Sequence, residues 1–168
     1  VPLLAEGYER SADGLTYTVR LKKGVQFHDG TEFDAEAVKL NFDRVLRPNS
    51  GLTRRAIYTF IDTVKAVDKY TVQFTLKYPH GGFIRRLAMN NTMMVCPSLI
   101  KAAGGNKAGL ALKSCGTGPY IQEEFNPSEK FVVKKNPNYR IKGLPKLDGI
   151  TFIPVPENST RAAMIRTG

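Results

Sequence analysis

The sequence contains no long apolar run. The nearest approach, from Leu87 to Ile100, is interrupted by Asn90, Asn91 and Thr92. A membrane-spanning helix needs roughly 18 or more consecutive apolar residues, so the sequence predicts no membrane span. Histidine and cysteine are also scarce, with two residues of each. Few residues are therefore available for a metal centre or for nucleophilic catalysis.

The two histidines, His28 and His80, give no indication of a metal site. Neither lies near a cysteine or in a helix-spaced acidic pair, which are common settings for zinc ligands. His28 stands beside the turn-forming pair Asp29-Gly30 and is interpreted as a turn residue. Catalysis by Cys115 would need a base and an orienting partner, and the local sequence places neither. We expect no catalytic residue, no metal ligand, no cofactor and no enzyme activity.

The two cysteines, Cys96 and Cys115, leave two interpretations open. An even number permits one disulfide, which would close a loop that contains Gly104, Gly105 and Gly109. Reduced, half-buried thiols that pack as small apolar side chains fit the sequence at least as well.

Acidic residues are outnumbered: 25 Lys and Arg stand against 15 Asp and Glu, which gives a net charge of +10. Such an excess can indicate nucleic acid, an anionic membrane surface or an acidic partner. The basic residues are scattered, with short clusters at Arg54-Arg55, Arg85-Arg86 and Lys134-Lys135. Scattered cations predict a solvated surface, because clustering marks a nucleic-acid face. A basic α+β nucleic-acid-binding domain, with the strand from Phe131 to Lys135 as its binding face, is the alternative.

The segment Gly116-Thr117-Gly118-Pro119 differs from a phosphate-binding loop. It lacks the following Lys and Ser/Thr of that motif, and Pro119 removes a backbone N–H that such a loop would use. The segment predicts a sharp backbone path into a strand that begins at Tyr120.

The rest of the sequence is typical of a mixed α+β protein. A length of 168 residues, 42% of them hydrophobic and 24% charged, suits one core or one domain with a piece of another. Asp34 is suited to cap a helix, in which Ala35, Val38, Phe42 and Val45 recur at helical spacing.

Periodicity and turn residues place the other elements. Period-two alternation predicts a strand at 15–21 and an antiparallel hairpin at 61–67 and 71–76. Further elements are expected as short helices at 83–88 and 97–103, strands at 120–125, 131–135 and 149–155, and a helix that starts near Ser159.

Several sequence blocks follow one another in an order that carries a family resemblance. They are Pro2-Leu3-Leu4-Ala5-Glu6-Gly7-Tyr8-Glu9, Asp13-Gly14-Leu15-Thr16-Tyr17-Thr18-Val19-Arg20-Leu21, Gly24-Val25-Gln26-Phe27-His28-Asp29-Gly30, Phe33-Asp34-Ala35-Glu36-Ala37-Val38, Gly116-Thr117-Gly118-Pro119-Tyr120, Lys135-Asn136-Pro137-Asn138-Tyr139, Leu147-Asp148-Gly149-Ile150-Thr151-Phe152 and Pro156-Glu157-Asn158-Ser159-Thr160-Arg161-Ala162. Together they resemble bacterial extracellular solute-binding proteins of family 5, the peptide and nickel receptors of ABC importers.

The resemblance implies a periplasmic-binding-protein-like type II fold, of which this chain holds part of the first lobe. Family members are about three times as long, so the chain is expected to be a fragment. Residues from about 15 to 135 are expected to form the small α+β subdomain, and 1–14 and 146–168 to be flanking pieces of the main lobe. The chain departs from the family in having no Trp, and Arg140 stands where an aromatic residue usually follows the Asn-Pro-x-Tyr block.

The resemblance also implies a function. The intact protein is expected to be a monomeric receptor that closes on a peptide or a metal chelate and delivers it to ABC permease subunits. It is expected in the periplasm or another extracytoplasmic site, with a lipoprotein as an open alternative for the full-length form, and without a nucleic-acid partner. Because the second lobe holds most of the ligand's charged groups in such receptors, the chain alone is expected to bind no transport ligand with useful affinity.

The ligand-cleft candidates are Met93 and Met94, because methionine side chains adapt to varied ligands, together with Arg54 and Arg55 at the cleft mouth. The alternatives are a buried strand for the two methionines and a solvated surface for the two arginines. In nickel-chelate members an Arg lies in the region of Met93, so its absence here favours a peptide-like ligand.

Overall fold

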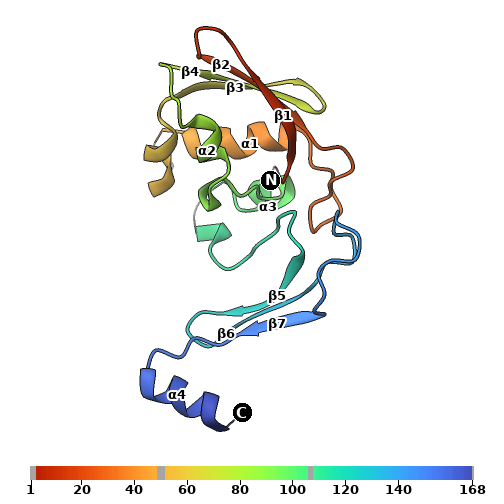
Figure 1. Cartoon of the computed structure of the whole chain (residues 1–168), viewed down its shortest axis with the longest axis vertical. Coiled ribbons are helices and arrows are strands. Elements are labelled where there is room, and N and C mark those ends of the chain that lie inside the picture. The colour runs from red at the N-terminus through yellow and green to blue at the C-terminus, as the bar shows by residue number, and fades with distance from the viewer. Residues whose placement is uncertain (1–2, 49–51, 106–107, 168) are drawn as a thin grey trace.

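The computed structural model describes residues 3–48, 52–105 and 108–167. Its strands form two separate antiparallel sheets (Figure 1). The first sheet lies at the top of Figure 1, short helices lie beneath it, and the second sheet and the C-terminal helix lie at the bottom. The mixed α+β fold predicted from the sequence is confirmed.

The first sheet has four strands in the order β1-β2-β4-β3. They are β1 (Ala5–Arg10), β2 (Thr16–Leu21), β3 (Ile61–Asp68) and β4 (Thr71–Leu76). Alternate residues of β2 and β4 are buried, and their register places Tyr17 opposite Phe74 and Val19 opposite Val72. Because successive side chains of a strand point to opposite faces, this pattern gives the sheet one apolar face. The predicted hairpin of β3 and β4 is confirmed.

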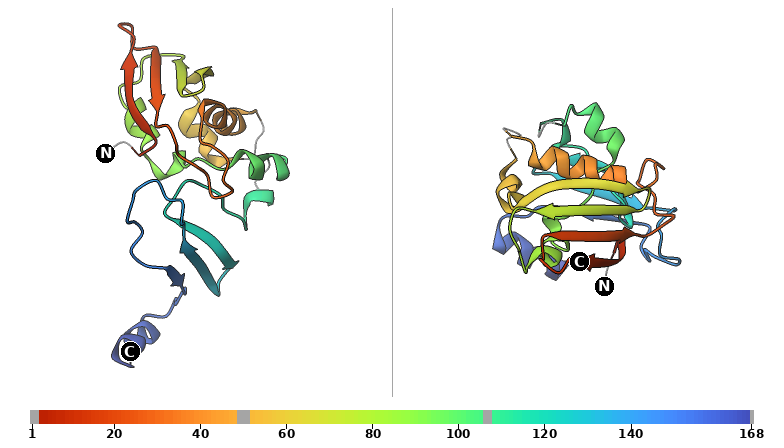
Figure 2. Two further views of the ribbon diagram at one scale, coloured as in Figure 1. Left: turned by 90° about the vertical axis from the view of Figure 1, so that its right-hand side faces the viewer. Right: turned by 90° about the horizontal axis from the view of Figure 1, so that it is seen from above.

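Helix α1 (Ala35–Leu46) covers that apolar face, against β3 and β4 (Figure 2). It begins after Asp34, whose carboxylate accepts a hydrogen bond from the N–H of Ala37 at 2.8 Å, as expected of a helix cap. Val38 and Phe42 are buried, and the Phe42 ring meets that of Phe74 edge to face at 5.0 Å. Aromatic edge contacts of this kind add to the stabilisation from burial, so α1 is firmly held on the sheet.

Short helices and turns fill the space beneath α1. They are η1 (Thr53–Tyr58), α2 (Phe83–Leu87), η2 (Asn90–Thr92), α3 (Pro97–Ala102) and η3 (Ala108–Leu110). Phe83 and Cys96 are fully buried in the same core as α1. The two helices predicted at 83–88 and 97–103 are therefore confirmed.

The second sheet contains β5 (Tyr120–Asn126), β6 (Lys130–Lys135) and β7 (Gly149–Phe152), in that order. Phe131 of β6 lies between Phe125 and Phe152, with ring centroids at 5.5 and 5.9 Å. Val133 of β6 is buried, at 7% exposed, and Pro145 in the link to β7 is also buried. The second sheet therefore has a much smaller core than the first.

The C-terminal part of the chain leaves large apolar side chains in solvent. Helix α4 (Asn158–Thr167) buries none of its residues, and Ile165 is 84% exposed. Ile153 after β7 is 60% exposed, and Phe152 is 52% exposed. Within the described ranges, no helix is both long enough and apolar enough to cross a membrane.

Strand pairing crosses both subdomain boundaries that are expected from the sequence, and these boundaries remain a prediction. Strand β1, placed outside the small subdomain, pairs with β2 from Ala5 to Arg10. Strands β5 and β6, placed inside it, pair with each other and with β7. Neighbouring strands satisfy each other's backbone N–H and C=O groups, so β1 belongs with the first sheet and β5 and β6 belong with the second.

Candidate functional site

Residues 89–96, hereafter the methionine segment, connect α2 to α3 and contain both predicted cleft methionines. The segment includes η2 and then runs without regular structure to Cys96. Met93 is 73% exposed, whereas Met94 is half-buried and packs against the core. Neither residue lies in a strand. The two methionines therefore have different surroundings, and Met93 has the side chain that a ligand can reach.

A pair of hydroxyl groups, from the buried Tyr58 and the half-buried Thr92, holds the start of the methionine segment. The Thr92 hydroxyl donates to the backbone carbonyl of Arg86 at 2.7 Å, and the Tyr58 hydroxyl lies 2.7 Å from the same Thr92 oxygen. Since the Thr92 proton is used toward Arg86, the Tyr58 hydroxyl is the donor in the second bond. Tyr58 is only 1% exposed. This pair ties η1 to η2, immediately before Met93.

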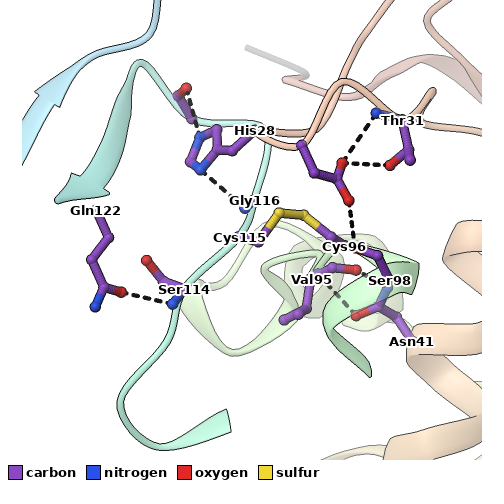
Figure 3. Close-up of a disulfide and its surroundings, with 12 residues drawn as sticks. His28, Thr31, Asn41, Val95, Cys96, Ser98, Ser114, Cys115, Gly116 and Gln122 are labelled. Carbon is purple, nitrogen blue, oxygen red and sulfur yellow. Dashed lines mark hydrogen bonds between the residues drawn. A yellow bond between two sulfur atoms is a disulfide. The ribbon is translucent and has the colours of Figure 1, made fainter. Parts of the chain in front are cut away.

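Asn41 of α1 binds Val95, the residue that follows the two methionines, and Figure 3 shows Asn41 beside Val95. Its side-chain amide donates to the backbone carbonyl of Val95 at 2.9 Å and accepts from the N–H of Val95 at 3.0 Å. A third bond runs from the same amide to the carbonyl of Ala37, at 2.9 Å. Asn41 is 4% exposed, so its polar groups are buried and fully used.

A disulfide between Cys96 and Cys115 ends the methionine segment (Figure 3). The two Cα atoms are 5.4 Å apart, within the usual range for such a bridge. The N–H of Cys96 also donates to the carbonyl of Cys115 at 2.9 Å. The structure thus gives the bridged form of the two cysteines, rather than the reduced thiols that the sequence allowed.

Asp29 lies near this disulfide but is used within the protein. Its carboxylate comes within 4.8 Å of both sulfur atoms. It accepts hydrogen bonds from the hydroxyl of Ser98 and from the N–H of Thr31 (Figure 3). Burial raises the pKa of Asp29, but the hydrogen bonds from Ser98 and Thr31 lower it by more. The pKa of Asp29 therefore lies below its usual value. Sulfur atoms in a disulfide carry no thiolate for a metal, so we assign the group a structural role.

His28 joins the turn before α1 to the Gly116–Pro119 segment, a contact that the sequence did not indicate. The N–H of Gly116 donates to His28 Nδ1 at 3.2 Å, and His28 Nε2 lies 3.1 Å from the carbonyl of Gly118. These partners require a neutral ring with its proton on Nε2. The backbone N–H of His28 also donates to the backbone carbonyl of Gly116, at 2.8 Å. His28 is therefore more than a local turn residue.

Gly116 also passes close to the methionine segment. A Cβ atom at position 116 would lie 3.5 Å from the carbonyl oxygen of Met94. The segment from 114 to 118 therefore runs directly beside Met94, and His28 and the disulfide hold it there. Sequence reasoning nominated Met93 and Met94 and left the Cys96–Cys115 bridge open, but it did not indicate the contacts made by Tyr58, Asn41 and His28.

Of the two predicted arginines, the structure describes the side chain of Arg55. The Nε of Arg55 donates to the carbonyl of Leu46 at the end of α1, at 3.3 Å. Part of its guanidinium is therefore used within the chain. The side chain of Arg54 lies outside the described residues. The hydroxyl pair of Tyr58 and Thr92 brings η1, which carries both arginines, beside the methionine segment.

In this arrangement the exposed Met93 side chain lies between two anchored residues, Thr92 and Val95. Comparison with known proteins gives the class of protein. The chain belongs to the bacterial extracellular solute-binding proteins of family 5, whose model matches residues 1–168.

One curated relative and two solved structures describe the similarity. The glutathione-binding protein GsiB of Salmonella paratyphi A is 46% identical over 166 residues, which cover 99% of this chain and 32% of GsiB. NikA from Brucella suis, solved with Fe(III)-EDTA, has a TM-score of 0.86 at 31% identity and matches 99% of this chain and 33% of its own. DppA from Helicobacter pylori, solved with the peptide STSA, has a TM-score of 0.85 at 30% identity, over 99% of this chain and 36% of its own.

These matches establish the periplasmic-binding-protein type II fold that the sequence blocks implied. The chain spans about a third of the length of the relatives that it matches.

Proposed function

We propose that this chain forms part of the first lobe of the substrate-binding receptor of an ABC importer, for peptides or metal chelates. The observation that carries the proposal is the match to family 5 along residues 1–168. The 46% identity to a glutathione-binding relative supports it. The receptor binds and delivers its ligand without changing it chemically.

A peptide-like ligand fits the similarities better than a metal chelate. The relative at 46% identity is named for glutathione binding, and DppA was solved with a peptide. NikA, solved with Fe(III)-EDTA, is 31% identical. A thioether such as that of Met93 presents a soft, flexible and uncharged surface, which suits side chains of varied shape.

In this proposal the methionine segment forms one wall of the ligand cleft. Met93 provides the exposed side chain, and Arg54 and Arg55 lie toward the cleft mouth on η1. The ligand touches both lobes only when they close, so binding shifts the receptor toward its closed state. The first sheet and its helices form one subdomain, while the second sheet and α4 belong to the main part of the lobe.

The surroundings of the receptor follow from the same proposal. It acts as a monomer outside the cytoplasmic membrane, either free in the periplasm or attached to the membrane through a lipid, and it docks on the permease subunits of the importer. The net charge of +10 is carried by solvated side chains. Of the basic residues on β6, Lys130 pairs with Glu124 at 2.9 Å and Lys134 pairs with Glu123 at 3.7 Å. These ion pairs weigh against the nucleic-acid alternative, because they partly neutralise the strand it requires.

Isothermal titration calorimetry on the full-length receptor tests the function. The probes are reduced glutathione, the dipeptide Met-Leu and Ni(L-His). We expect saturable binding of at least one peptide probe with micromolar or tighter affinity. Absence of binding to all three probes, combined with salt-dependent retention on immobilised DNA, would contradict the proposal and favour the nucleic-acid alternative.

A further inference from the structure

The methionine segment is fixed at its two ends but has free backbone groups in its middle. Among the described residues, the N–H of Met94 and the carbonyl oxygens of Met93 and Met94 have no hydrogen-bond partner. On one side Thr92 is bound to Tyr58 and Arg86, and on the other Val95 is bound to Asn41. The two methionines therefore form a short stretch between two anchored residues, in which Met93 is exposed and Met94 is half-buried.

Asn41 provides an unusual anchor, because it lies in the buried face of a helix. An amide removed from water destabilises the fold unless its donors and acceptor find partners. Both N–H groups of the Asn41 amide are used, by Ala37 and Val95, and its oxygen accepts from Val95. The two bonds to Val95 reproduce the pairing that a neighbouring strand would give. They also fix the amide orientation, since the reverse would set donor against donor.

Asn41 links the methionine segment to α1, because its side chain is bonded to Val95 and its backbone belongs to the helix. Val38 and Phe42, its neighbours on the buried face, are 4% and 3% exposed and pack in the core of the first sheet. The bonds to Val95 therefore connect a loop to a rigid element. Asn41 and Val95 are 54 residues apart in the chain, so no local turn provides this restraint.

We propose that Asn41 is a positioning residue for ligand binding. Its amide holds the backbone of Val95, so that Met93 and Met94 keep one arrangement before the ligand arrives. The inference rests on the proposed function, in which this segment lines the cleft. A wall that is ordered in advance loses less entropy on binding than one that the ligand must order. Loss of this restraint is expected to weaken affinity by about tenfold in all, which corresponds to the backbone entropy of about one residue.

The test uses the full-length receptor and the variants Asn41→Leu and Asn41→Ala. Asn41→Leu keeps the volume of the side chain. Asn41→Ala is the second variant in case the leucine variant does not fold, because alanine favours a helix. Asn136→Leu is the matched control, because Asn136 is also 4% exposed. Its amide holds Gly118 and Asn138 beside the second sheet, and it makes no contact with Val95.

Two readouts separate positioning from general stability. Calorimetry with reduced glutathione and Met-Leu gives the affinity. Nuclear magnetic resonance of ¹³C-methyl methionine gives the order of Met93 and Met94, with Met164 on α4 as an internal reference. We expect the Asn41 variants to bind about tenfold more weakly and to show shifted, narrower methyl signals for Met93 and Met94 alone. The Asn136 variant should bind within about twofold of the wild type.

Folded Asn41 variants with unchanged affinity would overturn the inference, whether or not the methyl signals move. An equal loss of affinity in the Asn136 variant would also overturn it, because the effect would then follow from stability. A wild-type receptor that binds neither peptide probe nor Ni(L-His) would contradict the proposed function itself, and the inference with it.

Discussion

At position 28 a single imidazole connects parts of the chain that are 88 and 90 residues apart. The ring accepts from Gly116 and donates to Gly118, so one side chain fixes a bend of the backbone on both sides. No other residue type offers a donor and an acceptor on opposite edges of a rigid ring of this size. His28 thus holds the path by which the chain leaves the first sheet for the second.

Replacement of this histidine should lower stability. We expect His28→Phe to reduce the free energy of unfolding by about 1–3 kcal/mol, because it removes two hydrogen bonds and leaves Gly116 N–H and Gly118 C=O with fewer partners. Urea unfolding followed by circular dichroism measures the change. His80→Phe is the control, since His80 accepts one local bond, from Gly82. Equal stability of His28→Phe and the wild type would show that these bonds contribute nothing.

Asp29 should make the stability depend on pH. Its pKa in the folded protein lies below the usual 3.8: burial raises it, but the hydrogen bonds from Ser98 and Thr31 outweigh burial. A carboxyl with a lowered folded pKa stabilises the fold above its unfolded pKa, and this contribution disappears as the pH falls through the folded value. The stability difference between the wild type and Asp29→Asn should therefore shrink below pH 3.8.

Unfolding measured from neutral pH into the acidic range checks this expectation. The comparison with Asp29→Asn is needed because Asp13, Glu32 and Asp68 also have lowered pKa values. A difference that stays constant over the whole range would show that ionisation of Asp29 does not stabilise the fold.

At the scale of elements, the Cys96–Cys115 bridge ties the start of α3 to the segment that leads to β5. The bridged residues are 19 positions apart. In the chain-entropy treatment, a loop of this length stabilises the folded state by about 3 kcal/mol. We expect the double variant Cys96→Ser, Cys115→Ser to lose about this much free energy of unfolding in urea titrations.

Reduction of the wild type with a phosphine is the independent check, since it should give the same loss without a substitution. A reductant that leaves the unfolding midpoint of the wild type unchanged would indicate that the bridge contributes little. The comparison is best made at neutral pH, where the ionisation of Asp29 beside the bridge is constant.

Local patterns sufficed to predict most elements of this fold. The cap at Asp34 and the spacing of Val38 and Phe42 predict α1, and the alternation of Val72, Phe74 and Leu76 predicts β4. Strand β1 was missed, because Ala5–Arg10 has no apolar alternation and most of its side chains are exposed. It forms because the edge of β2 offers backbone partners, which no pattern within β1 records.

The sequence predicted the methionines of the candidate site, but it did not predict most of the contacts that hold them in place. Met93 and Met94 stand out by composition, since methionine is rare in this chain and occurs four times. The bonds that hold them come from Asn41, Tyr58 and Cys115, which are far away in sequence. Such pairings depend on how α1, η1 and the 114–118 segment pack together, and the sequence around Asn41 indicates only a helix.

At the scale of the whole molecule, the two sheets differ in how well they are covered. The first sheet is closed on one face by α1 and the short helices. The second sheet and α4 leave Phe152, Ile153 and Ile165 exposed. Large apolar side chains in solvent mark surfaces that are covered in the functional assembly. This is consistent with a chain that matches a third of the length of its relatives.

The same asymmetry bears on ligand binding. A receptor wall can be fully formed and still bind weakly, because contacts from the opposite lobe supply much of the free energy of binding. The methionine segment offers the exposed side chains of Met89 and Met93 and a few free backbone groups. These groups can contribute to a cleft, but they do not enclose a ligand.

Calorimetric titration of reduced glutathione and Met-Leu into the 168-residue chain and into the full-length receptor, side by side, tests this account most directly. We predict no measurable heat of binding for the chain alone and saturable binding for the full-length receptor. Micromolar binding by the chain alone would contradict the account, because it would mean that these residues form a complete ligand site.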